Sequence, residues 1–337
     1  EDFNDAFSKI DTAVSDLQET FNTTASGGAL TIQEVINARK GKPTLVEKID
    51  EIDNNIVNVN EQLEHIAINA VAYGADNTGT VDCTSIIQNL LDTYGKVYLP
   101  KGYYKVSTLT LKAYNVLSGE GKMLSRLVTT NTYAIDIPYE ASSAIVKDLC
   151  CSGAGINVGS SGVLSVQDLN PTIDNVKIIG GTRGLMVGGN VRGGLFRNVS
   201  VGDSEIGFLI TGTDNVFDSC ISAMTLSHGF YCINANNGFS NCKAFCAGRT
   251  KYGIGFKMIG AFTRMVNCEA QQNFYENFWI QNSISSQFIG CISDGAGYQS
   301  DGKTYNNSEF GVIPFCSVYI HANKKCIMDF TIINGRN

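Results

Sequence analysis

The 337-residue sequence predicts an all-β fold, a right-handed parallel β-helix, preceded by an α-helical coiled-coil stalk that would make the molecule a trimer. Three observations predict this architecture: heptad-spaced apolar runs near the N-terminus, a glycine- and aspartate-rich segment leading into a short helix, and like residues recurring at intervals of about 22 positions. We expect residues 1–69 to form the stalk, 70–310 the β-helix, and 311–337 either its last coils or a C-terminal cap.

The predicted stalk contains two apolar runs in which steps of four and three residues alternate. The first run is Phe3, Phe7, Ile10, Val14, Leu17 and Phe21, and the second is Leu45, Ile49, Ile52, Ile56, Val59, Leu63 and Ile66. This alternation is the seam of a coiled coil, and β-branched residues at both seam positions favour three or four strands over a parallel dimer. The alternative is a pair of amphipathic helices packed on the body, because both runs are short.

A short linker lies between the two runs. It contains Asn37, Ala38 and Arg39 and continues through Thr44 and Leu45 into the second run. This segment resembles a linker common in tail and baseplate proteins of phages that infect Gram-positive bacteria, with Asn37 where an aspartate usually stands. The resemblance covers only residues 34–50, so it implies an origin and no chemistry.

The segment 70–106 is expected to start the β-helix. A turn at Gly74 is followed by a loop rich in glycine and aspartate, and Asp82 or Thr84 is a predicted N-cap. The helix that follows carries Ile86, Ile87, Leu90 and Leu91 and would cover the open end of the first coil. A parallel sheet needs such a lid because its first strand would otherwise present unpaired edges.

The residues of this segment also carry a family resemblance. Gly74-Ala75, Asp76, Thr84 and the later run from Val97 to Tyr104 resemble the opening of the pectate-lyase-like right-handed β-helix superfamily, which includes phage tailspikes and polysaccharide depolymerases. Cys83 stands where the family usually has a second aspartate. The resemblance implies a scaffold role for the motif, with activity varying from member to member.

From Pro171 onward, the sequence can be stacked on itself in columns. The clearest columns are Val176, Val199, Cys220, Cys242, Cys268 and Cys291; Ile173, Phe196, Phe217, Phe239, Met265 and Phe288; Ile178, Val201, Ser222, Ala244, Ala270 and Ser293; and Leu185, Phe208, Phe230, Phe256 and Phe278. Like residues in register are typical of stacked coils, because neighbouring strands lie about 4.8 Å apart and bury one another's apolar face. The repeat therefore predicts a β-solenoid.

Two of the columns suggest chemistry but have a structural interpretation. The cysteines read most simply as small buried side chains, with a redox role as the alternative. Asn175, Asn198, Asn241 and Asn267 precede the cysteine column in four coils. We expect them to form a ladder that satisfies turn amides inside the helix.

Composition excludes several classes of function. A net charge of -7 without a lysine or arginine cluster argues against nucleic acid, and no apolar stretch approaches the length of a membrane span. Eleven cysteines, an odd number without paired CxxC motifs, argue against zinc and a disulfide framework. We therefore expect free thiols, no metal, no cofactor and assembly in the cytoplasm of a host bacterium.

The outward residues of the coils separate into structural and functional candidates. Asp174, Arg197 and Asp218, and Lys243 beside Glu269, are expected to form cross-strand charge pairs of small energetic consequence. A second outward column is unusually apolar and consists of Met186, Leu209, Tyr231, Lys257 and Trp279. Such a strip should be covered, either by a neighbouring subunit or by a glycan. As substrate ligands, Tyr231 and Trp279 would stack on sugar rings and Lys257 would meet a carboxylate or phosphate.

The loops that join the two predicted strands of each coil supply the remaining candidates. We take Glu205, Glu276, His228 and Asp203 as candidate catalytic residues and Arg249 and Tyr275 as further substrate ligands. A hydrolase would need two carboxylates about 5 to 9.5 Å apart, and a lyase a base beside a cation that neutralises the substrate's carboxylate. The loops hold candidates for both, and exposed acids and bases in loops are also commonly only solvated.

These observations lead to one expectation of function and two alternatives. We expect a phage tailspike or tail-fibre protein in the virion tail that binds, and as a hydrolase or lyase degrades, a bacterial surface polysaccharide. Homotrimers would contact other tail proteins through the stalk. The alternatives are a receptor binder without catalysis and a purely structural tail component.

Overall fold

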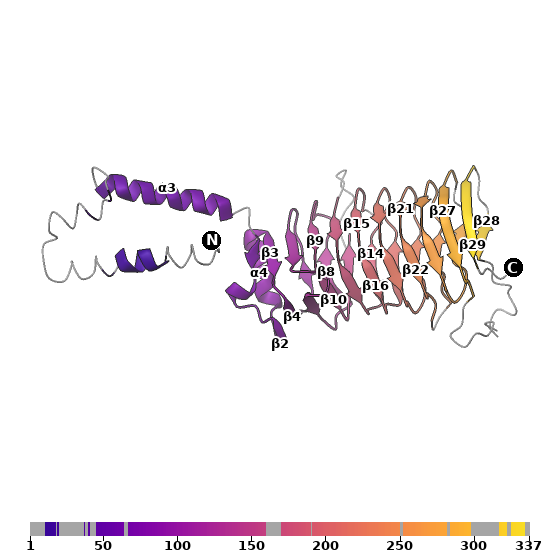
Figure 1. Cartoon of the computed structure of the whole chain (residues 1–337), viewed down its shortest axis with the longest axis horizontal. Coiled ribbons are helices and arrows are strands. Elements are labelled where there is room, and N and C mark those ends of the chain that lie inside the picture. Colours follow the sequence, from indigo (N-terminus) through magenta and orange to yellow (C-terminus); the bar gives the residue numbers. More distant parts are fainter. Residues whose placement is uncertain are drawn as a thin grey trace. The chain divides into compact units, whose positions relative to one another are not determined.

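The computed structural model describes two separate units of the chain, Glu1–Ile66 and Ala67–Asn337, shown in Figure 1. The described residues are 11–17, 19, 37, 40, 45–63, 67–159, 170–189, 191–249, 252–281, 284–297, 317–321 and 325–333. No helix in these ranges is long and apolar enough to cross a membrane.

The first unit contains helices where the heptad runs predict them. Residues 11–17 are helical, and α3 spans Leu45–Leu63. The seam residues Val14, Leu17, Ile49 and Ile52 are all exposed on this chain. The side chains of the other seam residues lie outside the described residues. An exposed apolar seam is what a coiled-coil partner would cover, and the trimer itself stays a prediction.

The second unit is a parallel β-helix whose strands form three columns (Figure 1). The first column is β1 (Ile68–Asn69), β3 (Lys96–Leu99), β6 (Val116–Gly119), β9 (Ile145–Lys147), β12 (Thr172–Asp174), β15 (Leu195–Arg197), β18 (Val216–Asp218), β21 (Gly238–Ser240), β24 (Arg264–Val266), β27 (Gln287–Asp294) and β29 (Ile327–Ile333). The second is β2 (Thr78–Asp82), β4 (Gly102–Lys105), β7 (Ser125–Val128), β10 (Cys150–Ser152), β13 (Lys177–Ile179), β16 (Ser200–Gly202), β19 (Ile221–Ala223), β22 (Lys243–Phe245) and β25 (Glu269–Gln271). It merges with the first column at β27, which pairs with both β24 and β25.

The third column forms a sheet of its own. Its strands are β5 (Leu109–Thr110), β8 (Tyr133–Ile137), β11 (Gly155–Val158), β14 (Arg183–Val187), β17 (Ile206–Ile210), β20 (Phe230–Cys232), β23 (Phe256–Met258), β26 (Phe278–Gln281) and β28 (Val318–His321). β28 pairs with β26 and β29 pairs with β27, both in parallel. Within residues 311–337 the described strands therefore continue the coils. The division of the chain at residue 310 stays a prediction.

The predicted lid over the first coil is present. Helix α4 (Thr84–Tyr94) follows the short 3₁₀ helix η1 (Val71–Tyr73) and buries Ile87, Leu90 and Leu91 against the first strands. Its N-cap position is occupied by Cys83, which corrects the expected Asp82 or Thr84. Asp82 still serves this helix end, because its Oδ1 accepts the backbone N–H of Thr84 at 2.9 Å.

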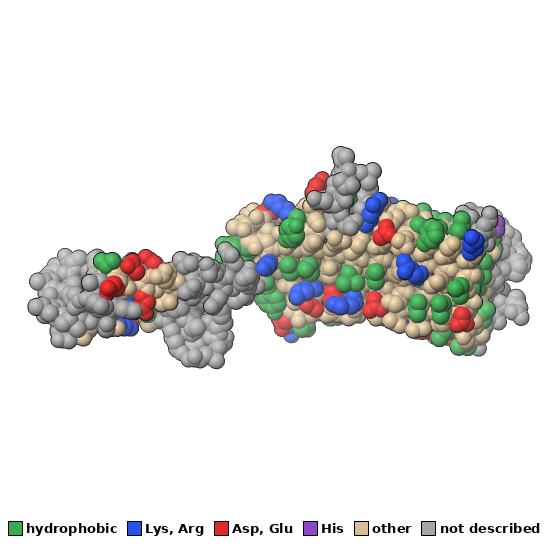
Figure 2. Space-filling view, turned by 90° about the horizontal axis from the view of Figure 1, so that it is seen from above, with side chains coloured by type: hydrophobic (Ala, Val, Ile, Leu, Met, Phe, Trp, Pro, Cys, Tyr) green, Lys and Arg blue, Asp and Glu red, His purple; other side chains and the backbone are tan. Residues whose placement is uncertain are grey.

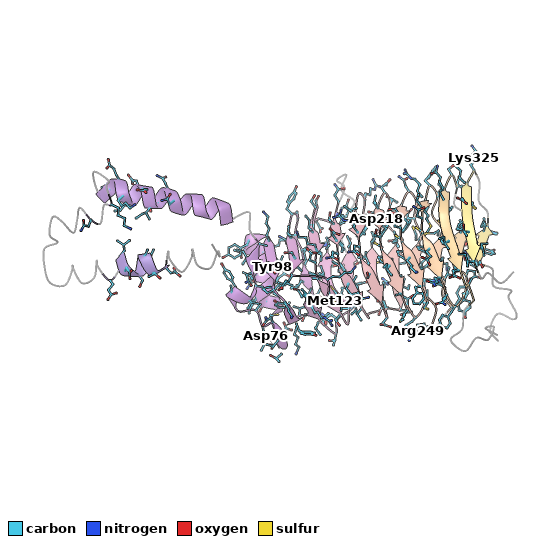
Figure 3. All side chains as sticks on the ribbon, viewed as in Figure 1. Asp76, Tyr98, Met123, Asp218, Arg249 and Lys325 are labelled. Carbon is cyan, nitrogen blue, oxygen red and sulfur yellow. The ribbon has the colours of Figure 1, made fainter. Side chains whose placement is uncertain are left out.

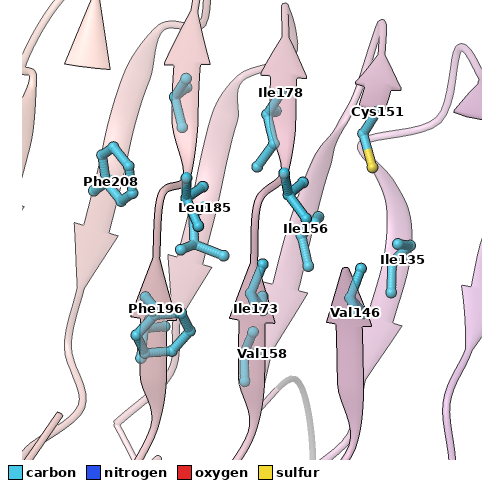
Figure 4. Close-up of a cluster of buried hydrophobic side chains, with 14 of the residues drawn as sticks. Ile135, Val146, Cys151, Ile156, Val158, Ile173, Ile178, Leu185, Phe196 and Phe208 are labelled. Atoms are coloured by element: carbon cyan, nitrogen blue, oxygen red, sulfur yellow. The ribbon is translucent and has the colours of Figure 1, made fainter. Parts of the chain in front are cut away.

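The inward columns pair in the predicted register. Phe196, Phe217 and Phe239 are partners on successive strands of the first column, and Phe208, Phe230, Phe256 and Phe278 on those of the third. Their rings stack with centroids 4.3–5.2 Å apart. Figure 4 shows the aliphatic start of the same columns. Each buried ring contributes roughly 1.5–3 kcal/mol from burial, and each stacked pair about 0.5–1.5 kcal/mol more.

The cysteine column is buried, as predicted. Cys220, Cys242, Cys268 and Cys291 are at most 1% exposed, and the ten cysteines in the described part of the chain are free thiols. No group of three or more potential metal ligands occurs among the described residues. The column therefore acts as packing, with thiols stacked above one another in the core.

The asparagine ladder exists, but its predicted place inside the helix is wrong. Asn198 Nδ2 donates to Asn175 Oδ1 at 2.9 Å, and Asn175 Nδ2 donates to Asp148 Oδ1 at 2.7 Å. Asn198, Asn241 and Asn267 are exposed. All of these asparagines have φ between 50° and 54°. The reason is backbone conformation: the turn between the first two columns requires a left-handed residue, which asparagine tolerates.

Candidate functional site

The candidate site lies where three successive coils enter the third sheet. The backbone N–H of Gly229 donates to Ile254 O, and that of Gly255 donates to Glu276 O. His228, Ile254 and Glu276 therefore follow one another in a single column, one coil apart. Each stands two residues before the first inward phenylalanine of its strand, so the start of the sheet fixes its position.

His228 is held as a neutral ring in this column. Its Nδ1 accepts the backbone N–H of Ile254 at 3.0 Å, and the ring is buried against Tyr231 and Tyr252. Burial, assisted by the nearby charge of Lys257, lowers the pKa of His228 to about 3. With Nδ1 engaged, the proton resides on Nε2, which makes His228 a hydrogen-bond donor at neutral pH. In this tautomer neither ring nitrogen has a free lone pair, and the predicted catalytic role of His228 stays a prediction.

Glu276 is a buried carboxyl group that accepts a hydrogen bond from the phenol of Tyr252. Its side chain belongs to a residue only 3% exposed, and Tyr252 donates its hydroxyl to Oε2 at 3.1 Å. The ring of Tyr275 packs against that of Tyr252, with centroids 4.4 Å apart. Burial raises the pKa of Glu276, while the Tyr252 hydrogen bond and the charge of Lys257 offset part of the rise. A carboxyl group in this environment is suited to giving up a proton as a general acid.

The outward strip of the third sheet runs beside this column. Met186, Leu209, Tyr231, Lys257, Trp279 and Tyr319 are register partners on successive strands. The ammonium nitrogen of Lys257 lies 4.6 Å from the centroid of the Tyr231 ring. The Trp279 and Tyr319 rings have centroids 4.1 Å apart, and Trp279 Nε1 donates to Gln281 Oε1.

These contacts change how the strip meets a ligand. The rings turn a face toward their neighbours along the strip, so stacking partners for Tyr231 and Trp279 come from within the chain. A sugar ring that stacks on Tyr231 or Trp279 as predicted would therefore compete with Lys257 or Tyr319, respectively, for the same ring face. Met186, Tyr231, Lys257 and Trp279 are partly exposed on the strip, whereas Leu209 is buried, which corrects its predicted outward exposure. Whether a subunit or a glycan covers the strip stays a prediction.

The remaining predicted residues are Arg249, Asp203 and Glu205. Arg249 forms an exposed ion pair with Asp203, with Nη1 3.1 Å from Oδ1, at the edge of the body marked in Figure 3. Glu205 stands one coil before Ser227, whose N–H donates to Glu205 O. It is therefore three coils from Glu276, or about 14 Å between backbones at about 4.8 Å per coil. Glycosidases hold their two carboxyl groups about 5–9.5 Å apart, a separation that also depends on where the two side chains point, so this carboxylate pair stays a prediction.

The outward charges predicted to pair as structure do so. Arg197 Nη2 lies 2.5 Å from Asp174 Oδ2, and Lys243 Nζ lies 3.1 Å from Glu269 Oε1. The space-filling view likewise shows acidic and basic side chains interspersed on one face of the body (Figure 2). Such exposed pairs contribute about 0–1 kcal/mol each, which separates them from the buried cluster.

Two residues of the site were missed from the sequence alone. Tyr252 belongs to the longest of the loops between the second and third strand columns, where an insertion obscures the repeat. A tyrosine one coil before Tyr275 was nevertheless a usable signal. Tyr319 lies beyond the last coil that the repeat defined. Its register opposite Trp279 emerges only from the pairing of β28 with β26.

Comparison with known proteins identifies the fold. No family model matches the chain, and no curated protein matches it. Among solved structures, the enzymatically active domain of tailspike protein 2 from bacteriophage CBA120 superposes with a TM-score of 0.62 at 16% identity, over 79% of this chain and 43% of that domain. The Dettilon tailspike protein has a TM-score of 0.51 at 11% identity, over 79% of this chain and 61% of the other.

A third similar structure has a described activity. Tailspike protein gp49 of the Acinetobacter baumannii bacteriophage Fri1, a capsular polysaccharide depolymerase, has a TM-score of 0.50 at 13% identity. The match covers 81% of this chain and 65% of that protein. The chain thus spans less than half of the first of these structures and about two thirds of the third. The body has the parallel β-helix fold seen in phage tailspikes.

Proposed function

We propose that the chain belongs to a phage tail spike or tail fibre that binds a bacterial surface polysaccharide and depolymerises it. The observation that carries this proposal is the buried Glu276–Tyr252 pair beside the outward strip, on a fold shared with phage tailspikes. The solved gp49 tailspike, described as a capsular polysaccharide depolymerase, supports the substrate class. As the sequence suggests, the virion tail would be the place of action.

In this proposal, Glu276 gives its proton to the oxygen of the scissile glycosidic bond. Burial favours its protonated form, and Tyr252 holds the carboxyl group in place through Oε2. The chain's aromatic side chains and Lys257 would bind sugar units along the strip. General acid catalysis of this kind contributes about 10²–10⁴-fold to a rate. Both hydrolysis and elimination use such a proton donor, so the reaction stays a hydrolase or a lyase.

The proposal extends to assembly. Exposed seam residues on α3 support a parallel trimer joined through the stalk, because β-branched seam positions disfavour dimers. The same stalk would attach the trimer to other tail proteins.

A second function, receptor binding without cleavage, is favoured by one observation. Glu205 and Glu276 are three coils apart, about 14 Å between backbones, so they would form the close pair of carboxylates that a glycosidase uses only if both side chains extend toward each other. A single buried acid suits recognition as well as it suits catalysis.

One experiment separates the two functions. Purified protein is incubated with capsular and cell-wall polysaccharides from candidate hosts, and the products are sized. Shortened chains with new reducing ends indicate a hydrolase, and shortened chains with an unsaturated chromophore indicate a lyase. Tight binding with unchanged chain length indicates a receptor binder. A protein that neither binds nor shortens any of these polysaccharides would contradict the proposed function.

A further inference from the structure

Lys257 is a half-buried cation whose charge acts on Glu276 but which has no carboxylate within ion-pair distance in the described residues. Among the described residues it has no ion pair, whereas Lys243, Arg197 and Arg249 each have one on the surface of the same body. Burial lowers the pKa of Lys257, which means that the protein does not fully replace the water that its ammonium group loses.

Lys122 is a second partly buried lysine in this fold, and its ammonium group does have hydrogen-bond acceptors. Burial also lowers the pKa of Lys122. Its Nζ, however, donates to the backbone oxygen of Asn198 at 2.6 Å and to Asn198 Oδ1 at 2.9 Å. Lys257 has the Tyr231 ring on one side at 4.6 Å and no protein oxygen as a hydrogen-bond acceptor in the described residues. An ammonium group has three donors, so those pointing away from the ring are available to a ligand.

We propose that the site binds an anionic polysaccharide whose carboxylate or phosphate group sits on the Lys257 ammonium. This inference rests on the proposed function and names its substrate class. The ring of Tyr231 fixes the ammonium from one side, as aromatic faces do for cations at about 5 Å. Trp279, in register on the next coil, borders the same position. A partly desolvated, unpaired charge is where an anion gains most from binding.

Binding an anion there has a consequence for Glu276. The groups that act on the Glu276 carboxyl are its own backbone N–H, the Tyr252 hydroxyl and the charge of Lys257 from β23. The rings of Tyr275 and His228 pack against Tyr252. Of these, only Lys257 contributes a positive charge that stabilises the ionised carboxylate, since His228 is neutral above about pH 3. A bound anion neutralises that charge and adds a negative one nearby. Glu276 therefore takes up a proton more readily in the complex. Binding of the anionic substrate thus favours the protonated form of Glu276 that general acid catalysis requires.

The first test measures affinity by titration calorimetry. The probes are polygalacturonate for carboxylates, poly(glycerol phosphate) for phosphates, and dextran as a neutral polymer of matched length. We expect at least one anionic polymer to bind more than tenfold tighter than dextran, and the better of the two identifies the anion. Lys257→Gln should weaken that binding about tenfold to hundredfold, and Lys257→Arg should restore most of it.

The control is Lys243→Gln, which removes an exposed lysine on the second strand column and should leave affinity unchanged. Equal weakening by both variants would show that only overall charge matters and would overturn the inference. Dextran binding as well as the anions, with no effect of Lys257→Gln, would also overturn it while leaving polysaccharide binding intact. Binding of no polymer, including the host polysaccharides above, would contradict the proposed function itself.

The second test uses pH, between 5 and 8, where the polymer anions keep their charge. Binding by the wild type should tighten as pH falls, by at most about tenfold per unit because one proton is taken up. Glu276→Gln should still bind the anion but lose this pH dependence. His321→Gln, which removes an exposed histidine beside Tyr319, should keep it. Loss of the dependence in His321→Gln, or its persistence in Glu276→Gln, would contradict the coupling.

Discussion

The combinations Lys243–Glu269 and Lys257–Glu276 each join neighbouring coils of this β-helix, yet they differ in register, contact and burial. Lys243 and Glu269 lie on the second strand column, 3.1 Å apart, each about one-third exposed. Lys257 and Glu276 lie on and beside the third column and form no ion pair, and the glutamate is almost fully buried. The comparison teaches that residue type and spacing do not define a site. Burial and the neighbouring groups do.

The difference has a simple electrostatic origin. At the surface, water screens both charges, so an ion pair costs little and contributes little. In the buried column, the carboxyl group loses water and gains its own backbone N–H, the Tyr252 hydroxyl and the charge of a lysine beyond ion-pair distance, which together do not cancel the rise in its pKa. The Glu276 carboxyl and the Lys257 ammonium can therefore form further polar contacts with a ligand.

The largest expected contrast between the two regions is in catalysis. Glu276→Gln keeps the side-chain volume but cannot donate a carboxylic proton, so depolymerisation should fall about 10²–10⁴-fold. Glu269→Gln should leave the rate unchanged. Product sizing over time measures both. A Glu276→Gln variant that still depolymerises at the normal rate would show that Glu276 is not the general acid. Glu205→Gln then tests the other candidate.

The next contrast concerns acid stability. Because the pKa of His228 is about 3 in the folded protein and near 6.5 when unfolded, the unfolded state binds more protons between these values. Stability should fall as pH drops through this window, by at most about 5 kcal/mol from this group. His228→Asn can still accept the Ile254 N–H but cannot titrate, so its denaturant-unfolding free energy should change less from pH 6.5 to pH 3.5. An unchanged slope would contradict the buried neutral ring.

A smaller effect is expected from the phenol that serves Glu276. Tyr252→Phe removes a hydrogen bond that stabilises the ionised carboxylate, so the pKa of Glu276 should rise further. The alkaline limb of the pH–rate profile, which needs the protonated acid, should move to higher pH, with a change in the maximal rate of about threefold to tenfold. A shift to lower pH would mean that Tyr252 has another role.

The smallest effect should come from the exposed pair. Lys243→Gln and Glu269→Gln should each change the free energy of unfolding by less than about 0.5 kcal/mol, and less still in high salt. Chemical denaturation of both single variants and the double variant gives the coupling energy directly. A coupling above about 1 kcal/mol would erase the distinction between the two regions.

Much of the scaffold was predictable because it is repetitive. The phenylalanine, cysteine and outward columns pair in the structure as the sequence register predicts, and the lid over the first coil is where the opening motif placed it. The predictions of the N-cap residue and of the asparagine ladder's place inside the helix were wrong, because both features depend on the local backbone conformation of a turn. The joining of Tyr252 to Glu276 was not predictable across an insertion of irregular length.

The sequence by itself determined the stack of coils, the inward faces and the strip that contains Lys257. Residues at equal positions of a repeat must meet when strands lie in register, so those contacts follow from counting. Only the tertiary structure decided that Glu276 is buried, that His228 is neutral and that Lys257 has a ring but no carboxylate beside it. Those properties depend on how each turn bends into the sheet and on what it excludes from water. Neither the bend of a turn nor the exclusion of water can be predicted from residue spacing.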